Sequence, residues 1–249
     1  MPAPSVHDAG SAQNVGGTSN TLSLTTTAGV AAVVACVQSY TDGGTISGVT
    51  WNGSAMTQAV ALGGNRQARI YYALDSTPRT ANVVASFGSS INSRLTVFSL
   101  RAVKPTDPVR VTGTHTEGAW APANAETHGP TIASDPLDLV ISQAHTNNAE
   151  GGDVAYAGDL NAYINSAYGA IRVARGPGDS SFQAWWTQDS TPDADGQSWI
   201  VAAAFTGISA GSRAWIMAAR RWQEFLKDLK HGLVSPDVLR RRYKGLVAI

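Results

Sequence analysis

The sequence predicts a mainly β protein, a two-halved β-sandwich followed by a C-terminal helical hairpin. Apolar and polar residues alternate over short runs as far as about residue 209, which is typical of strands with one buried face. The chain has 25 glycines and 43% apolar residues among its 249 residues, so it has both the turns and the core that many short strands need. After residue 209 the apolar period becomes 3.6, which indicates an amphipathic helix.

Residues 1–19 predict a flexible N-terminal arm, because the segment Gly10–Asn20 has almost no apolar side chain to bury. Alternation begins at Thr21. The strands predicted in the first half lie around Leu22 and Leu24, and at Val30–Val37, Ile46–Trp51, Ala68–Leu74, Ala81–Phe87 and Leu95–Leu100.

Asn52 and Gly53 predict a tight hairpin turn directly after the strand that ends at Trp51. Both residues tolerate the positive φ that a type I′ turn requires. The return strand is expected over Ser54–Val60.

The later part of the chain repeats the earlier pattern. Leu137–Gln143 resembles Ala31–Gln38, and Ala170–Ala174 resembles Ala68–Tyr72. Further strands are expected at Phe182–Thr187 and Trp199–Phe205. We therefore expect one β-sandwich over residues 20–209, made of two similar halves at about 20–104 and 127–209 that complete each other across a shared core.

Four runs resemble a known class of domain: Leu22–Thr25, Val49–Thr57, Arg69–Leu74 and Asp138–Val140. They are similar to runs in jelly-roll-like β-sandwich modules of bacteriophage structural proteins and bacterial surface proteins. The resemblance covers about residues 20–209. It implies a jelly-roll type of sandwich and a role as a virion or surface component, with no common active site to carry over.

The C-terminal tail, residues 210–249, predicts two helices. Ser212 is a suitable N-cap, Gly232 ends the first helix, and Ser235 with Pro236 starts the second. Residues 211–249 contain nine basic and three acidic residues, a net charge of +6, and the remaining chain carries −6. The neutral total therefore conceals a basic tail on an acidic body.

Two interpretations of the tail remain open: its apolar stripe packs on its own sandwich, or it docks into another subunit. A third interpretation is that the cluster Arg240–Arg242 contacts nucleic acid or a membrane surface, but three adjacent arginines are weak evidence for it. The residues expected to bind a partner are Trp215, Trp222, Phe225, Leu229, Arg240, Arg241, Arg242, Leu246 and Ile249.

Composition and local patterns argue against several classes of protein. Charged residues make up 14%, below the roughly 25% of ordinary domains, and 18 basic residues balance 18 acidic ones, which argues against a nucleic-acid binder. Cys36 lies in an apolar run and is expected to be a small buried residue. The first 20 residues lack a signal-peptide pattern, and no run is long enough to span a membrane.

Candidate chemistry is sparse, and we expect no enzyme and no cofactor. His115 with Glu117 and Glu126 with His128 would offer four metal ligands if their strands formed a hairpin, although a solvated connection explains them more simply. Ser180 follows Gly178 in a turn, without the strand–turn–helix of a serine nucleophile.

Adjacent tryptophans Trp185 and Trp186 must face opposite sides of their strand, so one of them points away from the core. Such a tryptophan suits either a subunit interface or stacking on a sugar ring.

From these observations we expect a non-enzymatic structural subunit of a bacteriophage or phage-like virion, a head decoration, vertex or tail-associated protein assembled in the host cytoplasm. Its partners would be other capsid, vertex or tail subunits, including copies of itself, engaged through the helical tail. The alternative is a carbohydrate- or receptor-binding module that uses Trp185 or Trp186.

Overall fold

The computed structural model divides the chain into a body, Pro2–Gly207, and a second unit that contains Ile208–Ile249. All regular structure in the described part is β-strand, so the predicted mainly β class is confirmed. The predicted helices of residues 210–249 lie outside the described residues. The structure describes residues 4–39, 43–64, 66–117, 126–135, 137–146, 154–155, 161–162, 172–177, 182–188 and 198–208.

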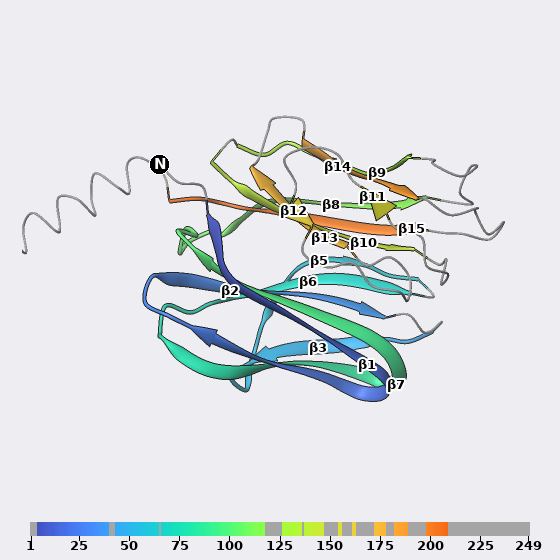
Figure 1. The fold of residues 1–249 in the computed structure, drawn as a ribbon, viewed down its shortest axis with the longest axis horizontal. Helices are drawn as coiled ribbons and strands as arrows, with labels where there is room; N and C mark the ends of the chain where they lie inside the picture. The colour runs from blue at the N-terminus through green and yellow to red at the C-terminus, as the bar shows by residue number, and fades with distance from the viewer. Residues whose placement is uncertain are drawn as a thin grey trace, which may run out of the picture. The chain divides into compact units, whose positions relative to one another are not determined.

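The first half of the body is a seven-stranded antiparallel sheet in the order β4-β3-β7-β2-β6-β5, with β1 paired along β7. Because β1 and β7 are long and both bend, the sheet folds over itself into two layers (Figure 1). The strands are β1 (Ser5–Thr26), β2 (Val30–Ser39), β3 (Ile46–Trp51), β4 (Ser54–Ala55), β5 (Thr57–Leu62), β6 (Gln67–Leu74) and β7 (Arg79–Arg101).

We call these two layers inner and outer. The inner layer contains β5, β6, β2, the second part of β7 and the first part of β1. The outer layer contains β3, the first part of β7 and the second part of β1. β1 and β7 therefore belong to both layers, and this continuity ties the two layers together.

The N-terminal segment differs from the prediction. Residues 5–19 belong to β1 and pair with β7, from Ser5 opposite Arg101 to Ser19 opposite Ser86, so the predicted flexible arm is wrong for them. Their order comes from main-chain hydrogen bonds to a distant strand, which side-chain composition does not reveal. Buried Asn20 secures the bend of β1 by donating from Nδ2 to the carbonyl oxygen of Ala12 at 3.0 Å.

The predicted turn at Asn52 and Gly53 is confirmed, with φ values of 50° and 78°. Trp51 lies opposite Ser54 across this turn. The predicted return strand is divided at Met56: β4 pairs with β3, whereas β5 crosses to β6. One chain segment therefore contributes to both layers.

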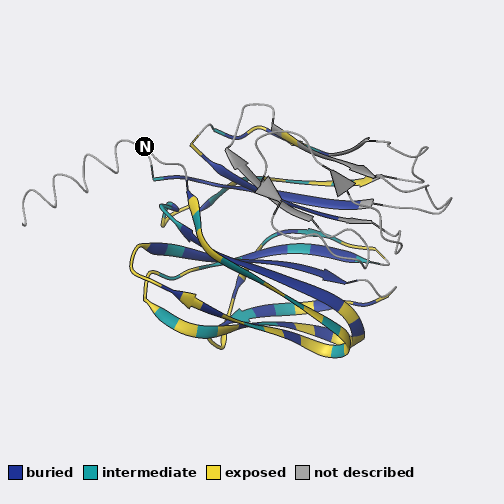
Figure 2. Ribbon diagram, in the orientation of Figure 1, coloured by how far each residue is buried: buried dark blue, intermediate teal, exposed yellow. Residues whose placement is uncertain are grey.

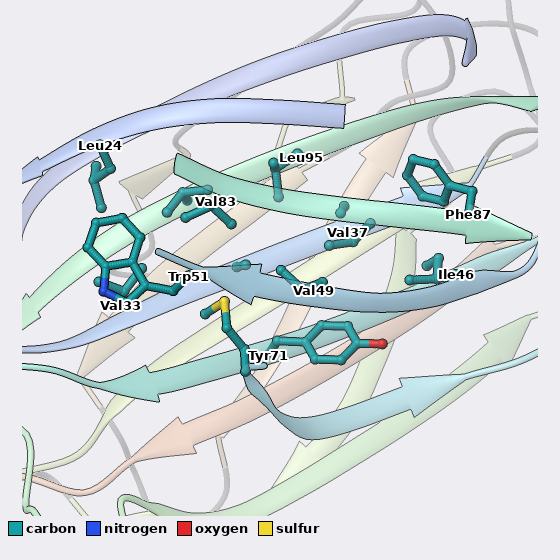
Figure 3. Close-up of a cluster of buried hydrophobic side chains, with 14 of the residues drawn as sticks. Leu24, Val33, Val37, Ile46, Val49, Trp51, Tyr71, Val83, Phe87 and Leu95 are labelled. Atoms are coloured by element: carbon teal, nitrogen blue, oxygen red, sulfur yellow. The ribbon is translucent and has the colours of Figure 1, made fainter. Parts of the chain in front are cut away.

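The core between the layers of the first half is apolar (Figure 3). Trp51 points into it beside Leu24 and Val83, and its indole Nε1 donates to the carboxylate of Asp75 at 2.8 Å. The indole thus keeps a hydrogen-bond partner while its rings are buried. Arg79 completes the arrangement with an ion pair to Asp75 at 3.3 Å.

This arrangement predicts acid sensitivity. Burial alone would raise the pKa of Asp75, but hydrogen bonds from Trp51 and Thr77 and the charge of Arg79 hold that pKa below its ordinary value of 3.8. A depressed carboxyl pKa contributes stability that is fully present above pH 3.8 and is lost as the pH falls through the folded-state pKa. Urea unfolding at pH 7 and pH 3 should show a smaller loss for Asp75→Asn than for the parent protein, and an equal loss would contradict this assignment.

The second half repeats this layout in two separate sheets. A five-stranded sheet has the order β12-β13-β10-β15-β8, and a three-stranded sheet has the order β11-β14-β9. The strands are β8 (Val109–Glu117), β9 (Glu126–Ile132), β10 (Leu139–Thr146), β11 (Val154–Ala155), β12 (Asn161–Ala162), β13 (Arg172–Pro177), β14 (Phe182–Gln188) and β15 (Ser198–Phe205).

The two inner layers have the same strand order, with β12, β13, β10, β15 and β8 in place of β5, β6, β2, β7 and β1. In each inner layer a phenylalanine stands opposite an apolar residue of the middle strand: Phe98 lies opposite Val34, and Phe205 lies opposite Leu139. Each half thus supplies two layers of its own, whereas the sequence predicts that each half supplies part of a single sandwich. Ala68 stands opposite Gln38 of β2, and in the second half Val173, not Ala170, stands opposite Gln143 of β10.

The inner layers of the two halves pack face to face and share one apolar cluster, which we call the central cluster (Figures 1 and 2). Its members in the first half include Val34, Cys36 and Phe98, and those in the second half include Ile141 and Phe205. The side chains of β2, the middle strand of its inner layer, are buried on both faces. The body is therefore a stack of four layers with the central cluster at its middle.

Cys36 is buried in the central cluster, which confirms the prediction from its apolar run. Burial raises the pKa of its thiol, so the reactive thiolate is scarce at neutral pH. We expect maleimide to leave Cys36 unmodified in the native protein and to label it rapidly in denaturing urea, as measured by intact mass. Labelling of the native protein at the urea rate would show that the two inner layers separate freely.

Candidate functional site

The strand directions give the body two ends, which we call the distal end and the base. β2 and β10 both finish at the distal end. Their last residues lie close together there, as the hydrogen bond from Gln38 Nε2 to the carbonyl oxygen of Ala144 shows, at 2.9 Å. Their antiparallel neighbours β6, β13 and β15 therefore begin at that end. The connections between strands lie at these two ends, and such connections are the usual place for binding residues.

His115 lies near the distal end of β8, half-buried and opposite Ile200 of β15. It shares its face of β8 with Gly113, where an added Cβ would lie 2.7 Å from Cβ of Pro130 on β9. This face is therefore directed at the outer layer of the second half. β8 pairs with β15 and β9 pairs with β14, so the described ladders do not contain the β8–β9 hairpin that a site with all four ligands would need.

The other three candidate ligands lie on the same two strands. The main chain of Glu117 pairs with Ser198, that of Glu126 with Thr187, and that of His128 with Trp185. The side chains of Glu117, Glu126 and His128 lie outside the described part of the structure. Among the side chains that are described, no three His, Cys, Asp or Glu come together as metal ligands.

Trp185 and Trp186 lie in the second part of β14, opposite His128 and Thr127 of β9, and the register is irregular between Gln183 and Trp185. Their side chains lie outside the described part. Trp199 is buried, and the guanidinium carbon of Arg66 lies 6.0 Å from its ring. Trp199 thus joins the second half to the connection between β5 and β6 of the first half.

The base combines the first and last described residues of the body. Val103 forms a β-bridge with Gly207, and an added Cβ on Gly207 would lie 3.2 Å from Cδ of Pro4 and 2.6 Å from the carbonyl oxygen of Leu137. The side chain of Leu137 is exposed, as is that of Leu74 at the end of β6. Exposed leucines therefore occur at the end of the body where the chain continues into Ile208.

A buried ion pair lies at the base of the second half. Asp138 is fully buried and accepts a hydrogen bond from Nε of Arg110 at 2.6 Å and another from the amide of Asp135 at 3.0 Å. The hydrogen bond and charge of Asp138 raise the pKa of Arg110, against a smaller opposing effect of its burial. These contacts fix the turn that leads into β10.

Sequence reasoning missed two buried glutamines, Gln38 on β2 and Gln143 on β10. Gln143 Nε2 donates to the carbonyl oxygen of Val37 at 3.0 Å, and this contact reciprocates the bond from Gln38 to Ala144. The sequence does contain a signal for these two residues, because each of the similar apolar runs Ala31–Gln38 and Leu137–Gln143 ends in a glutamine. The predicted partner-binding residues of the tail, from Trp215 to Ile249, and Ser180 lie outside the described residues.

Compared with known proteins, the chain matches no family model, no curated protein and no solved structure. In the part of the chain that the structure describes, no helix is long and apolar enough to cross a membrane.

Proposed function

We propose that the body consists of two jelly-roll-type sandwiches in tandem. In each half the first strand pairs with the last, the last pairs with the third, and the third pairs with the sixth, if the two parts of β1 and of β7 are counted separately and β4 with β5 is counted as one strand. Two layers joined in this order are typical of jelly rolls, which occur in viral capsid proteins and lectins. Fold alone does not assign a function, so the proposal rests on the residues at the two ends of the body.

The function supported best is that of a non-enzymatic structural subunit of a bacteriophage or phage-like virion, a head decoration, vertex or tail-associated protein. One observation carries this proposal: the body ends at its base, where Pro4, Gly207 and exposed Leu137 lie together. Residues 211–249, with their net charge of +6 and the apolar stripe of their sequence, follow Gly207 along the chain and would serve as the anchor. The resemblance of residues 20–209 to phage structural modules supports the virion as the setting.

The partners under this proposal are capsid, vertex or tail subunits, including copies of the same chain. Apolar residues such as Trp215 and Trp222 would bury against the partner, and Arg240–Arg242 would contact its acidic surface. Exposed Leu74 and Leu137 would extend the apolar contact onto the base. The distal end then remains accessible on the assembled particle.

Truncation after Ala210 tests the anchor. We expect the shortened protein to keep a folded body, with unchanged thermal unfolding of its β structure by circular dichroism, and to lose incorporation into particles. Light scattering of both forms in solution measures whether self-association is lost as well. Incorporation of the shortened protein at the full-length level would contradict the proposal, as would unfolding of the body on truncation.

The second candidate function is binding of a surface glycan or receptor. The specific observation in its favour is the place of Trp185 and Trp186 in the second part of β14, toward the distal end, where an anchored body meets its surroundings. A saccharide titration followed by tryptophan fluorescence tests it. Saturable binding that Trp185→Ala or Trp186→Ala abolishes, and that Trp51→Phe in the buried core retains, would support this function.

A further inference from the structure

Arg94 on β7 is a buried cation held by a neutral side chain. It is 8% exposed and lies on the face of β7 that carries Phe98, a member of the central cluster. Its Nη2 donates to Oε1 of Gln13 on β1, at 2.9 Å. Its Nε is buried, and within the described residues neither a hydrogen bond to Nε nor an ion pair to the guanidinium is present. A buried charge without a counter-charge is costly, so its retention calls for a functional explanation.

A second arginine of the same protein shows what this edge of a guanidinium binds. At the base, Arg110 donates from Nε and Nη2 to the two carboxylate oxygens of Asp138, at 2.6 Å and 3.4 Å. Arg94 presents the same Nε–Nη2 edge, but Gln13 offers it one neutral oxygen in place of two charged ones. A planar carboxylate accepts two parallel hydrogen bonds from this edge, and such charge-assisted bonds are about twice as strong as neutral ones. The edge of Arg94 is therefore suited to a carboxylate.

The side chain of Gln13 controls access to this edge. Gln13 and Ser11, two residues apart on β1, are both exposed. The described strands of the second half pack mainly over β5 and β6, whereas β7 and β1 lie on the other side of β2, so Gln13 is at the rim of the inner layer. Arg94 stands opposite Gln38, near the end of β2, and this places the rim site at the distal end. A ligand therefore reaches the guanidinium by displacing one exposed side chain and one neutral hydrogen bond.

The groups around Arg94 favour a saccharide as the carrier of the carboxylate. Ser11 lies opposite Thr96, and the Thr96 hydroxyl donates to the Ser11 hydroxyl at 3.5 Å. Hydroxyl and amide groups both donate and accept, as the ring hydroxyls of a sugar require. Arg94 is the one charged residue in residues 11–14 of β1 and 93–96 of β7. The site thus matches a single negative charge among neutral polar groups, whereas an acidic peptide segment or a nucleic acid needs several cations.

We propose that Arg94 and Gln13 form a binding site for a carboxylate-bearing saccharide, such as a uronic acid. Gln13 rotates aside, the carboxylate accepts hydrogen bonds from Nε and Nη2 of Arg94, and a ring hydroxyl bonds to Ser11. The site is separate from Trp185 and Trp186, which belong to β14 in the three-stranded sheet of the second half. Binding is measured on the free protein and does not require the tail, so the anchor proposal and this one fail independently.

The test is a titration of the full-length protein with glucuronate, followed by NMR at the Nε–H group of Arg94 and the backbone amides of Ser11 and Thr96. Glucose is the matched control ligand, because it has a hydroxymethyl group in place of the carboxylate. We expect millimolar glucuronate to shift these resonances saturably and glucose to leave them unchanged. Arg94→Lys keeps the charge but loses the two-donor edge, so it should raise Kd at least about tenfold. Absence of a saturable shift with glucuronate would overturn the proposal.

Gln13→Ala gives a test that does not depend on altering a buried residue. It removes the neutral oxygen that the ligand must displace, so glucuronate should bind about fivefold more tightly. Arg69→Lys is the matched control: Nη2 of Arg69 also donates to a glutamine Oε1, that of Gln67 at 2.9 Å, but Arg69 lies on the opposite face of the inner layer. Its Kd should stay within about twofold of the parent value. Unchanged affinity in Gln13→Ala, or equal losses in the two lysine variants, would overturn the assignment.

Three further measurements distinguish the source of the carboxylate. Acetate tests the carboxylate alone, and a capped glutamyl dipeptide tests a carboxylate from a protein partner. Either ligand binding as tightly as glucuronate would overturn the saccharide assignment. Trp185→Ala should leave the Kd for glucuronate unchanged. Binding that Trp185→Ala abolishes and Arg94→Lys retains would assign the saccharide to the second candidate function and overturn the site at Arg94.

Discussion

Replacing Asp138 with alanine is expected to lower the free energy of unfolding by about 3 kcal/mol, the range for breaking a buried ion pair from one side. The carboxylate is fully buried, and Nε of Arg110 and the amide of Asp135 both donate to it. Alanine leaves the amide without its acceptor and the guanidinium without its counter-charge. Urea denaturation followed by circular dichroism measures the loss.

Arg110 gives a graded companion to this result. Its side chain is 45% exposed, so solvent screens part of its charge, and Arg110→Met should cost about 2 kcal/mol, less than loss of Asp138. The double variant should cost less than the two single variants together, because both remove the same interaction. Asp107→Asn, in the exposed linker at φ 50°, serves as the control and should stay within about 0.5 kcal/mol of the parent. A loss at Asp138 no larger than that at Asp107 would exclude a structural role for the pair.

Gly113→Ala is expected to destabilise the second half by about 2 kcal/mol, a typical cost of overpacking. The added methyl group would lie 2.7 Å from Cβ and 2.9 Å from Cγ of Pro130, and the rigid proline ring on β9 cannot rotate away. Gly48→Ala is the matched control, because Gly48 also lies in a strand but an added Cβ there meets no atom within 4 Å. Thermal unfolding of the two variants should separate them clearly. Equal melting temperatures would show that β8 and β9 leave room for the added methyl group.

Sequence reasoning succeeds where local chemistry decides the structure. The turn at Asn52 and Gly53 needs positive φ at two adjacent residues, and few other residues accept it. The strand predicted at Ile46–Trp51 has the same bounds as β3. The prediction succeeds because β3 buries its apolar residues and leaves others partly exposed, so its sequence shows the expected alternation. Cys36 is likewise buried where its apolar neighbours predict.

It fails where order comes from a distant partner. The segment Gly10–Asn20 has small polar side chains and no alternation, yet its main chain pairs with β7 and Asn20 closes its bend. The sequence likewise left open whether His115 and His128 lie on paired strands, and the structure places β8 and β9 in different sheets. No local pattern distinguishes a pair of strands in one sheet from a pair that face each other across two layers.

The candidate site shows the same division. The sequence directs attention to tryptophans and to charged residues, which are informative by residue type. Gln38 and Gln143 have ordinary side chains, and only burial and the reciprocal bonds give them significance. Their contact depends on how the two inner layers pack, which composition and periodicity do not fix.

The pairing of β1 with β7 and of β8 with β15 governs how the protein can fold during synthesis. Ser5 meets Arg101 and Val109 meets Phe205, so each inner layer waits for about 100 further residues to leave the ribosome before its edge strand finds a partner. Contacts so remote in sequence place the chain among slowly folding topologies, at milliseconds to seconds. The first half can close while the second is still being translated. The apolar inner face of the first half then stays uncovered until β15 leaves the ribosome. This partly synthesised intermediate is the state most prone to aggregation.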